Sequence, residues 1–458
     1  MAPRITIIGG GSYQWVPKLL VDLANTSVLH EAEIVIEDID PAPVPRMVDL
    51  VKHIAQVRGI GLTAVGTTNQ REALEGADYV VVSISTGGFE SMRHDLEIPA
   101  KYGIRHSVGD SVGPAGIIRA LRNIPIFLDL ARDMEQVCPD AWLLNLTNPM
   151  TTITRSVNRE SSINAIGLCH EITIMQFMLS MMLGASFMEL SPTVAGVNHL
   201  PFISALDNGG QDGLAQLRDL LDHADKLGSD VLPMALPEGL GHEKISEGGD
   251  WTKGDLIHQN QLKLEVFRRF GVLPGAGDRH VAEFFAGFLT EESRWGERWG
   301  VELTSIEDRE RGQEGHIADF ETDLASPEVS QMPSGEMVAP MIQCRMNDQP
   351  GWFPLNIPNH GQVADLPHGV VVESMCTVDA SGVRGRDEVT LPPAMAEQLR
   401  QVSTSQELTV EAAITGNRDK VFEAMLEDPL AGRIDYDALG RMTDEMLAAT
   451  KRWLPQFS

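Results

Sequence analysis

"RITIIGGGSYQWVPKLLVDLANTS", residues 4–27, places three glycines between a strand-like apolar run and a segment with helical spacing. Gly9, Gly10 and Gly11 therefore occupy the first strand-to-helix turn. Glycine lets the backbone turn tightly there and approach a phosphate closely at the N-terminus of a helix. Position 14 is Gln14, so the third glycine of the G-x-G-x-x-G pattern is missing, and a plain tight turn stays open as the alternative.

The same alternation of strand-like and helix-like segments continues through the first 200 residues. The strand-like segments are rich in β-branched residues and lie at 32–40, 78–85, 141–147 and 163–169. Helix-like segments separate them, at 43–59, 116–138 and 151–160. Continuous apolar strands between helices predict a parallel sheet covered on both faces. We therefore predict a Rossmann-like, doubly wound α/β fold.

After about residue 200 the alternation weakens, which predicts a second region. Helical stretches at 214–227 and 254–271 precede a mixed segment with strands, and the chain ends in helices. We predict an NAD-binding domain at 1–200. Residues 201–458 would then form a mixed α+β cap at the carboxyl edge of the sheet, where such sheets place their ligands. We expect this cap to carry the substrate and metal site and also the contacts between subunits of an oligomer.

Composition excludes several classes of partner. The chain has 458 residues and a net charge of −29, so we expect neither nucleic acid nor an anionic membrane to bind it. Four cysteines without a C-x-x-C pair predict a reducing compartment, and we expect a cytoplasmic protein. The longest apolar patch, residues 172–188, is interrupted by polar residues and predicts a buried helix instead of a membrane span.

Carboxylates and possible metal ligands follow the predicted strands. Asp38 or Asp40 could bond the ribose of a dinucleotide, and a carboxylate there favours NAD over NADP. Cys169 and His199 each follow an apolar run, and together they suit Mn²⁺, Fe²⁺, Co²⁺ or Ni²⁺. A buried cysteine is also an ordinary small apolar side chain, and a single histidine is often a satisfied core residue. The residues alone leave both interpretations open.

Several longer motifs help to decide whether Cys169 and His199 are metal ligands or ordinary core residues. They are IPAKYG (98–103), VGDSVGPAGIIRALRNIP (108–125), NLTNPM (145–150), GLCHE (167–171), GVNHLPF (196–202) and FRRFGVLPGAGDRHVAEF (267–284). In this order behind the glycine turn they resemble glycoside hydrolase family 4, the NAD- and metal-dependent glycosidases. Lactate and malate dehydrogenases share the underlying fold but lack the Cys/His pair.

The resemblance implies a role for each matching residue. Gly9, Gly10, Gly11 and Ser12 would cradle NAD⁺, with Asp38 on the ribose. Cys169 and His199 would hold the metal, usually Mn²⁺. Asn148 would bind the cofactor and would also bond the C2 and C3 hydroxyls of the sugar. The remaining implied pocket residues are Asp110, His170 and Asn198.

The resemblance also implies the reaction. NAD⁺ would oxidise C3 of the sugar, a base would remove the C2 proton, the C1 substituent would leave by elimination, and water addition and re-reduction would complete the cycle. Many relatives use a tyrosine as the C2 base, and none of the four tyrosines falls in the corresponding region. Besides Asp110, we name Asp255 and Glu265 as catalytic candidates. Both could equally be solvated helix carboxylates, and a metal-bound hydroxide could also serve.

The four residues that begin at the metal-binding cysteine track the substrate in this family. Here they are Cys169-His170-Glu171-Ile172, which differs from the C-H-E-V of α-galacturonidases by one apolar exchange. The tetrad predicts an α-linked hexuronide, with an α-galacturonide as the first choice. Its carboxylate would need a cation, for which Arg93, Arg279 and His280 are candidates. Both arginines could instead be structural.

Other functions stay open. The alternatives are a neutral α-galactosidase or α-glucosidase with the same mechanism, an NAD-dependent C3 dehydrogenase without elimination, and a non-catalytic NAD sensor. Relatives of this kind are commonly dimers or tetramers, so the resemblance also implies a homodimer or homotetramer.

Overall fold

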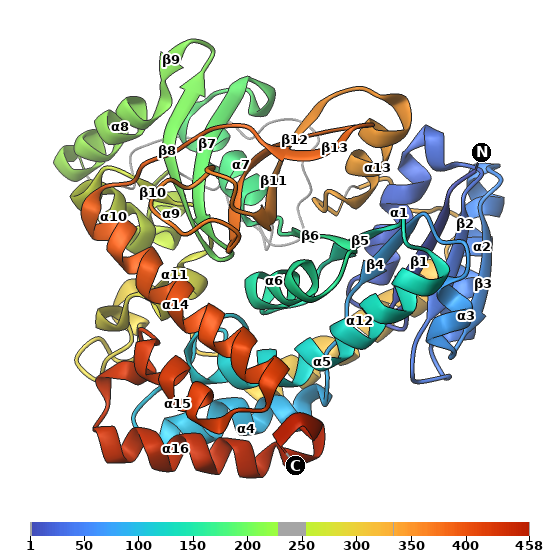
Figure 1. Cartoon of the computed structure of the whole chain (residues 1–458). Coiled ribbons are helices and arrows are strands. Elements are labelled where there is room, and N and C mark those ends of the chain that lie inside the picture. Colours follow the sequence, from blue (N-terminus) through green and yellow to red (C-terminus); the bar gives the residue numbers. More distant parts are fainter. Residues whose placement is uncertain (1, 228–252, 333, 458) are drawn as a thin grey trace.

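A single sheet runs through the computed structural model, which describes residues 2–227, 253–332 and 334–457 (Figure 1). Its parallel part has the order β3-β2-β1-β4-β5-β6. The strands are β1 (Arg4–Ile8), β2 (Glu33–Glu37), β3 (Thr63–Thr67), β4 (Tyr79–Val82), β5 (Trp142–Asn145) and β6 (Asn164–Leu168). The order reverses between β1 and β4, and such a switch point is where open α/β sheets bind ligands.

This arrangement confirms the predicted Rossmann-like α/β class, with one strand more than the sequence indicated. β3 is the edge strand, and its TAVGT sequence is half exposed, so it lacks the apolar signal of its neighbours. Helix α4 (Gly88–Lys101) was also not expected, because it begins at a glycine and contains Pro99.

Antiparallel strands continue the sheet beyond β6. Their order is β6-β11-β12-β7-β8-β10, with β13 on β12 and β9 on β8. They are β7 (Leu190–Val197), β8 (Leu200–Asn208), β9 (Gln211–Asp212), β10 (Leu273–Pro274), β11 (Gly351–Pro358), β12 (Val371–Asp379) and β13 (Gly382–Gly385). The second region therefore extends the sheet as well as covering it. Residue 200 begins β8 of a hairpin, and the domain boundary placed there stays a prediction.

Helices cover both faces of the sheet because its strands alternate their buried residues. Ile5 and Ile7 face one core and Ile8 faces the other. The first core includes α1 (Val16–Asn25), α2 (Val44–Arg58) and α13 (Val338–Asn347). The second includes α3 (Gln70–Leu74), α5 (Gly113–Val137), α6 (Met150–Glu160), α14 (Pro393–Thr415), α15 (Arg418–Glu427) and α16 (Tyr436–Ala449). Figure 1 shows α14, α15 and α16 gathered beside α5 and α4.

A third, smaller core lies under the β7–β8 hairpin. It joins α7 (Glu171–Leu183), α8 (Gly213–Leu227), α9 (Lys253–Gln259) and α10 (Gln261–Phe270). In α7 the side chains of Ile172, Met175 and Leu179 are buried, as expected for a helix of the protein interior. Among the described helices, none is long and apolar enough to cross a membrane.

Two further helices lie near the carboxyl edge of the parallel strands. α11 (Asp278–Phe284) follows β10 closely. α12 (Ile306–Ala325) is long, and its buried residues are only Ile306 and Phe320. It contacts α4 and α2, which flank the first glycine turn.

Candidate active site

The glycine turn leads directly from β1 toward α1. Gly9 has a positive φ of 76°, and a Cβ there would lie 2.1 Å from the carbonyl oxygen of Ser83. A Cβ on Gly11 would lie 2.4 Å from Cγ of Pro43. The turn therefore requires glycine, because it packs between the end of β4 and the start of α2. Ser12 Oγ accepts the backbone N–H of Trp15 at 3.3 Å, next to the start of α1.

Carboxylates crowd the end of β2 beside this turn. Asp38 Oδ2 accepts the N–H of Gly11 at 2.9 Å, and its Oδ1 accepts the N–H of Asp40 at 2.9 Å. Burial, with the charge of Asp38, raises the pKa of Glu37 to about 7. A phosphate on a ribose at this position would meet these carboxylates, whereas free hydroxyls could bond them.

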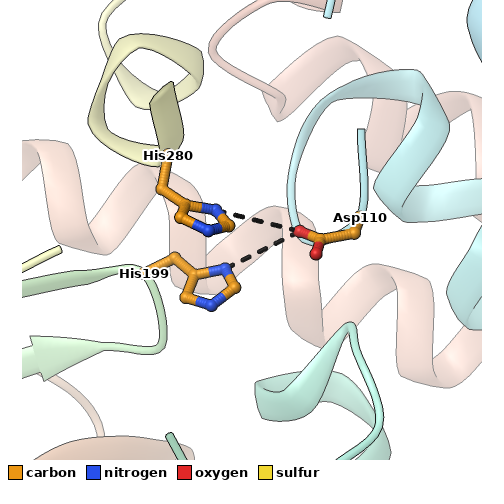
Figure 2. Close-up of side chains that lie close together, drawn as sticks. All are labelled: Asp110, His199 and His280. Atoms are coloured by element: carbon orange, nitrogen blue, oxygen red, sulfur yellow. Dashed lines mark ion pairs between the residues drawn. The ribbon is translucent and has the colours of Figure 1, made fainter. Parts of the chain in front are cut away.

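Three polar side chains converge at the carboxyl edge of the sheet. Figure 2 shows the rings of His199 and His280 stacked and directed toward the carboxylate of Asp110. Asp110 Oδ1 lies 3.7 Å from Nδ1 of His199 and 3.9 Å from Nδ1 of His280, and the ring centroids are 3.7 Å apart. One ligand atom from each residue lies within 4.8 Å of the others, which is close enough for all three to hold one cation.

Separate elements deliver these residues. Asp110 precedes α5, His280 lies on α11, and His199 sits in the turn of the β7–β8 hairpin with a positive φ of 64°. A left-handed backbone conformation costs energy in a histidine. The positive φ of His199 therefore indicates that the surrounding residues hold its ring in this position. Ser111 Oγ donates to Asp110 Oδ1 at 2.8 Å and lies 2.7 Å from Nδ1 of His199. Because the single hydroxyl proton goes to Asp110, Nδ1 of His199 donates to Ser111, which leaves Nε2 free as a ligand.

The electrostatic surroundings of Asp110 and His199 favour the forms of these two side chains that bind metal. Burial, followed by the charge of His280, lowers the pKa of His199 to about 3, so its imidazole is neutral. Burial alone would raise the pKa of Asp110, but the two imidazole rings beside it, the charge of Arg119 and the hydrogen bond from Ser111 outweigh burial and lower that pKa. A neutral imidazole and an ionised carboxylate are the forms that ligate divalent cations.

A buried carboxylate that the sequence did not reveal fixes the Asp110 loop, which is the segment between α4 and α5 that carries Asp110. Glu283 Oε1 accepts Nδ1–H of His106 at 3.1 Å and the backbone N–H groups of Val108 and Gly109, both at 2.9 Å. Glu283 lies on α11 with His280, so one residue ties the loop of Asp110 to the helix of His280. A lone glutamate in a helix gives no sequence signal for such a role.

The Cys169-His170-Glu171 segment follows β6 at the same edge. His170 Nδ1 lies 2.8 Å from Glu336 Oε1, and Glu171 Oε2 accepts the N–H of Gly277 at 2.5 Å. Burial alone would raise the pKa of Glu171, but the neighbouring imidazole rings, that of His280 first, and the hydrogen bond from the N–H of Gly277 lower it. Glu171 is therefore ionised, and it links α7 to the loop before α11.

Cys169 is buried and stays a predicted ligand. Its thiol is not part of the Asp110–His199–His280 cluster. Burial, with the charges of Glu373 and Glu171, raises the pKa of the thiol well above its usual value. Without a cation, Cys169 is therefore a neutral thiol, and a metal ion would supply the charge that a thiolate needs.

Buried polar atoms without partners surround the cluster. Asn148 Nδ2 donates to Asp110 Oδ2 at 3.1 Å, and Asn198 Nδ2 donates to Glu373 Oε2 at 3.2 Å. Within the described part of the chain, the Oδ1 atoms of both asparagines and Nδ1 of His280 have no hydrogen-bond partner. Unpaired buried acceptors are costly, so these atoms fit a site that binds a cation or sugar hydroxyls.

The other predicted site residues lie elsewhere or have other partners. Glu265 Oε1 accepts from Arg269 at 2.6 Å on the same helix. The side chain of Asp255, in α9, lies outside the described residues. Arg93 on α4 pairs with Glu97 and Glu307, both at 3.2 Å. Arg279 lies near the cluster, where its guanidinium donates to Ser107 O, Glu302 O and Thr304 Oγ1.

Glu373 is a further buried carboxylate next to the site, and its place in the apolar run VVVESM was a signal that sequence reasoning missed. It lies on β12 opposite Asn356 of β11. Burial raises its pKa to about 8. A protonated Glu373 can donate to Oδ1 of Asn356, which otherwise lacks a partner among the described residues.

Replacing Glu373 by glutamine is expected to stabilise the metal-free protein increasingly as pH rises. The unfolded pKa is 4.5 and the folded pKa about 8, so between these values the unfolded chain binds fewer protons and wild-type stability falls. The glutamine amide cannot ionise and keeps a donor for Asn356, so the gain should reach a few kcal/mol, on the order of 1.4 per pH unit. Urea unfolding in EDTA at pH 5 and pH 8 measures it. An equal effect of E373Q at both values would contradict the protonated state.

The comparisons with known proteins cover nearly the whole chain. The model of the family 4 glycosyl hydrolases matches residues 4–185, and that of their C-terminal domain matches residues 194–431. An alpha-galacturonidase of Thermoanaerobacterium saccharolyticum is 30% identical, over 98% of this chain and 96% of its own. An alpha-galactosidase of Rhizobium meliloti is 29% identical, over 99% of this chain and 90% of its own.

Solved structures agree with the fold. A Bacillus subtilis crystal structure, described as a candidate glucosidase, has a TM-score of 0.82 at 27% identity and covers 97% of this chain and 100% of its own. A 6-phospho-alpha-glucosidase from gut microorganisms, in complex with NAD and Mn²⁺, has a TM-score of 0.82 at 20% identity over the full length of both chains. Malate dehydrogenase of Cryptosporidium parvum has a TM-score of 0.51 at 14% identity, over 90% of this chain and 99% of its own. The dehydrogenase-like fold is therefore confirmed.

Proposed function

The chain belongs to family 4 of the glycosyl hydrolases and is a glycoside hydrolase, and on that premise we propose that it cleaves α-linked hexuronides with NAD⁺ and Mn²⁺. The observation that carries the proposal is the Asp110–His199–His280 cluster at the carboxyl edge of the sheet. It lies on the same edge as the glycine turn of β1, as a dinucleotide and a metal acting on one sugar require.

Both cofactors fit the residues present. The turn at Gly9–Ser12 with Asp38 would hold NAD⁺, and His199 with Cys169, or with Asp110 and His280, would hold Mn²⁺, Fe²⁺, Co²⁺ or Ni²⁺. When bound, they supply a hydride acceptor that is later a hydride donor, and a Lewis acid for the sugar oxygens. This chemistry makes the C2 proton acidic enough for a protein base at neutral pH.

The protein's own groups would position the sugar and move the proton. Asn148 and Asn198 present unpaired amide oxygens that can accept from sugar hydroxyls. Among the predicted catalytic carboxylates, Asp110 has the strongest support, since it is ionised within the cluster. Glu265 is engaged by Arg269, and Asp255 stays a prediction.

The tetrad and the relatives support a uronide. Cys169-His170-Glu171-Ile172 resembles the tetrad of α-galacturonidases, and alpha-galacturonidases are among the relatives at 28 to 30% identity. An anionic sugar needs a cation beyond the ionised Glu171, and Arg279 beside the Asp110 loop supplies one. Arg93 has less support, because it is paired with glutamates.

The runner-up is a neutral α-galactoside or α-glucoside, favoured by an alpha-galactosidase at 29% identity and an alpha-glucosidase at 30%. A cytoplasmic location and a homodimer or homotetramer remain part of the proposal. They rest on the cysteine content and on the family resemblance.

A panel of 4-nitrophenyl glycosides tests the function. We expect nitrophenol release from the α-galacturonide with NAD⁺ and Mn²⁺ present, and none when either is omitted. NAD⁺ should act catalytically, without a build-up of NADH. Cleavage of only the α-galactoside or α-glucoside would keep the mechanism and refute the uronide assignment. Stoichiometric NADH without nitrophenol would indicate a C3 dehydrogenase.

A further inference from the structure

Helix α12 crosses the parallel sheet above the glycine turn. At its N-terminal end, Thr304 donates its N–H to His106 O at 3.2 Å and its hydroxyl to Ser107 O at 2.8 Å. Near its C-terminal end, Phe320 packs edge-on against Tyr13 with ring centroids 5.0 Å apart. Tyr13 directly follows Ser12 of the glycine turn.

Topology fixes what lies beneath the helix. The sheet order is β4-β1-β2, and α12 contacts both α4, which follows β4, and α2, which follows β2. Glu307 pairs with Arg93 of α4, and Glu321 pairs with Arg46 of α2. These contacts on both sides of β1, together with the packing of Phe320 on Tyr13 after the glycine turn, place α12 over the carboxyl end of β1. It therefore spans from the Asp110 loop to the dinucleotide turn.

One face of α12 is directed at this site. Residues three and four apart share a face of a helix, so Arg309, Gln313 and His316 lie in line between the buried Ile306 and Phe320. Among residues 307–319, His316 alone is half-buried and the rest are exposed. The stripe is buried at both ends and exposed at Arg309 and Gln313, where a ligand would lie.

Arg309 is the cation of this stripe at the sugar end. Arg309 lies one helical turn beyond Ser305, the residue before α12. The residue before Ser305 is Thr304, whose Oγ1 accepts from Arg279 Nη2 at 2.8 Å. The Thr304 hydroxyl holds Arg279 directly before the first turn of α12, so Arg279 and Arg309 lie at the same end of this helix. Within the described residues, neither arginine forms an ion pair with a carboxylate.

We propose that Arg309 is a specificity-determining residue that binds the carboxylate of the substrate together with Arg279. The inference rests on the proposed uronide specificity. Arg279 is held by two backbone carbonyls and a hydroxyl, all neutral, so its charge remains available to a ligand. Arg309 donates to no described side chain, and its planar fork matches a carboxylate. α12 thereby places Arg309, which lies in none of the quoted motifs, where it can bind the substrate carboxylate.

The test compares Arg309→Ala with a matched control, Arg311→Ala. Arg311 lies on the opposite side of the same helix and pairs with Asp308 at 3.1 Å, so the control removes the same charge. For Arg309→Ala we expect kcat/KM on 4-nitrophenyl α-galacturonide to fall roughly 10- to 100-fold, as for the loss of a charged hydrogen bond. The control should stay within about twofold of wild type, since exposed ion pairs contribute little.

A further measurement separates the two possible anions, the substrate carboxylate and the pyrophosphate of NAD⁺. Titration calorimetry with NAD⁺ should give equal Kd values for wild type and Arg309→Ala. A weaker Kd for NAD⁺ in the variant, with unchanged KM for the uronide, would assign Arg309 to the pyrophosphate and overturn the inference. Arg309→Ala activity equal to wild type on the uronide would also overturn it while leaving the proposed function intact.

If wild type cleaves only a neutral glycoside, the proposed substrate fails, and inhibition by free galacturonate then tests Arg309 separately. Inhibition of wild type and the control but not of Arg309→Ala would support the carboxylate site. Absence of inhibition in wild type, or equal inhibition in all three proteins, would overturn it.

Discussion

Replacing His199 by alanine is expected to abolish metal binding and glycoside cleavage while the protein stays folded. His199 is the one residue common to both candidate ligand sets, the cluster with Asp110 and His280 and the pair with Cys169. A metal that stabilises developing charge contributes several kcal/mol, so kcat/KM should fall roughly 1000-fold or more. The neutral ring makes no ion pair whose loss would unfold the protein, because burial lowers its pKa to about 3.

Metal content, measured by plasma mass spectrometry after dialysis, reports loss of the ion, and circular dichroism of the same samples reports whether the fold is kept. His223→Ala, at an exposed position of α8, is the control and should retain both metal and activity. Cys169→Ser and His280→Ala then separate the two ligand sets, since each removes a ligand from only one of them. A His199→Ala protein that kept its metal and its activity would exclude both sets.

The sequence predicted the part of the fold in which local pattern and tertiary position agree. β1, its glycine turn and α1 could be recognised because apolar periodicity changes at Gly9 and the buried strands are apolar on both faces. β3 and α4 were not predicted, because an exposed edge strand and a helix with an internal proline lack those patterns.

The site was predictable residue by residue but not as an assembly. Asp110, His199 and His280 were each named, yet their approach to within ligand distance depends on the β7–β8 hairpin and α11 meeting the loop before α5. Glu283 and Glu336 form hydrogen bonds with residues far away in the sequence, and the local sequence around each glutamate does not predict these bonds. Arg309 lies in a polar helix, and the role proposed for it depends on the crossing of α12 above β1, which local sequence does not indicate.

Glu283→Ala is expected to destabilise the protein by about 3–5 kcal/mol, the usual cost of breaking a buried charged network. The carboxylate is 1% exposed, and its removal leaves His106 Nδ1 and the N–H groups of Val108 and Gly109 without an acceptor. The loop before Asp110 would then lose its attachment to α11, so activity should fall together with stability.

Glu283→Gln separates the loss of the acceptor from the loss of charge. All three donors converge on Oε1, and an amide oxygen can accept them from the same position, so this variant should keep most of its stability and activity. Urea unfolding midpoints measure the difference, with Glu397→Ala, which breaks an exposed pair to Arg400, as the control. If the glutamine variant were as unstable as the alanine variant, the negative charge of Glu283, more than its position as an acceptor, would hold the loop that carries Asp110.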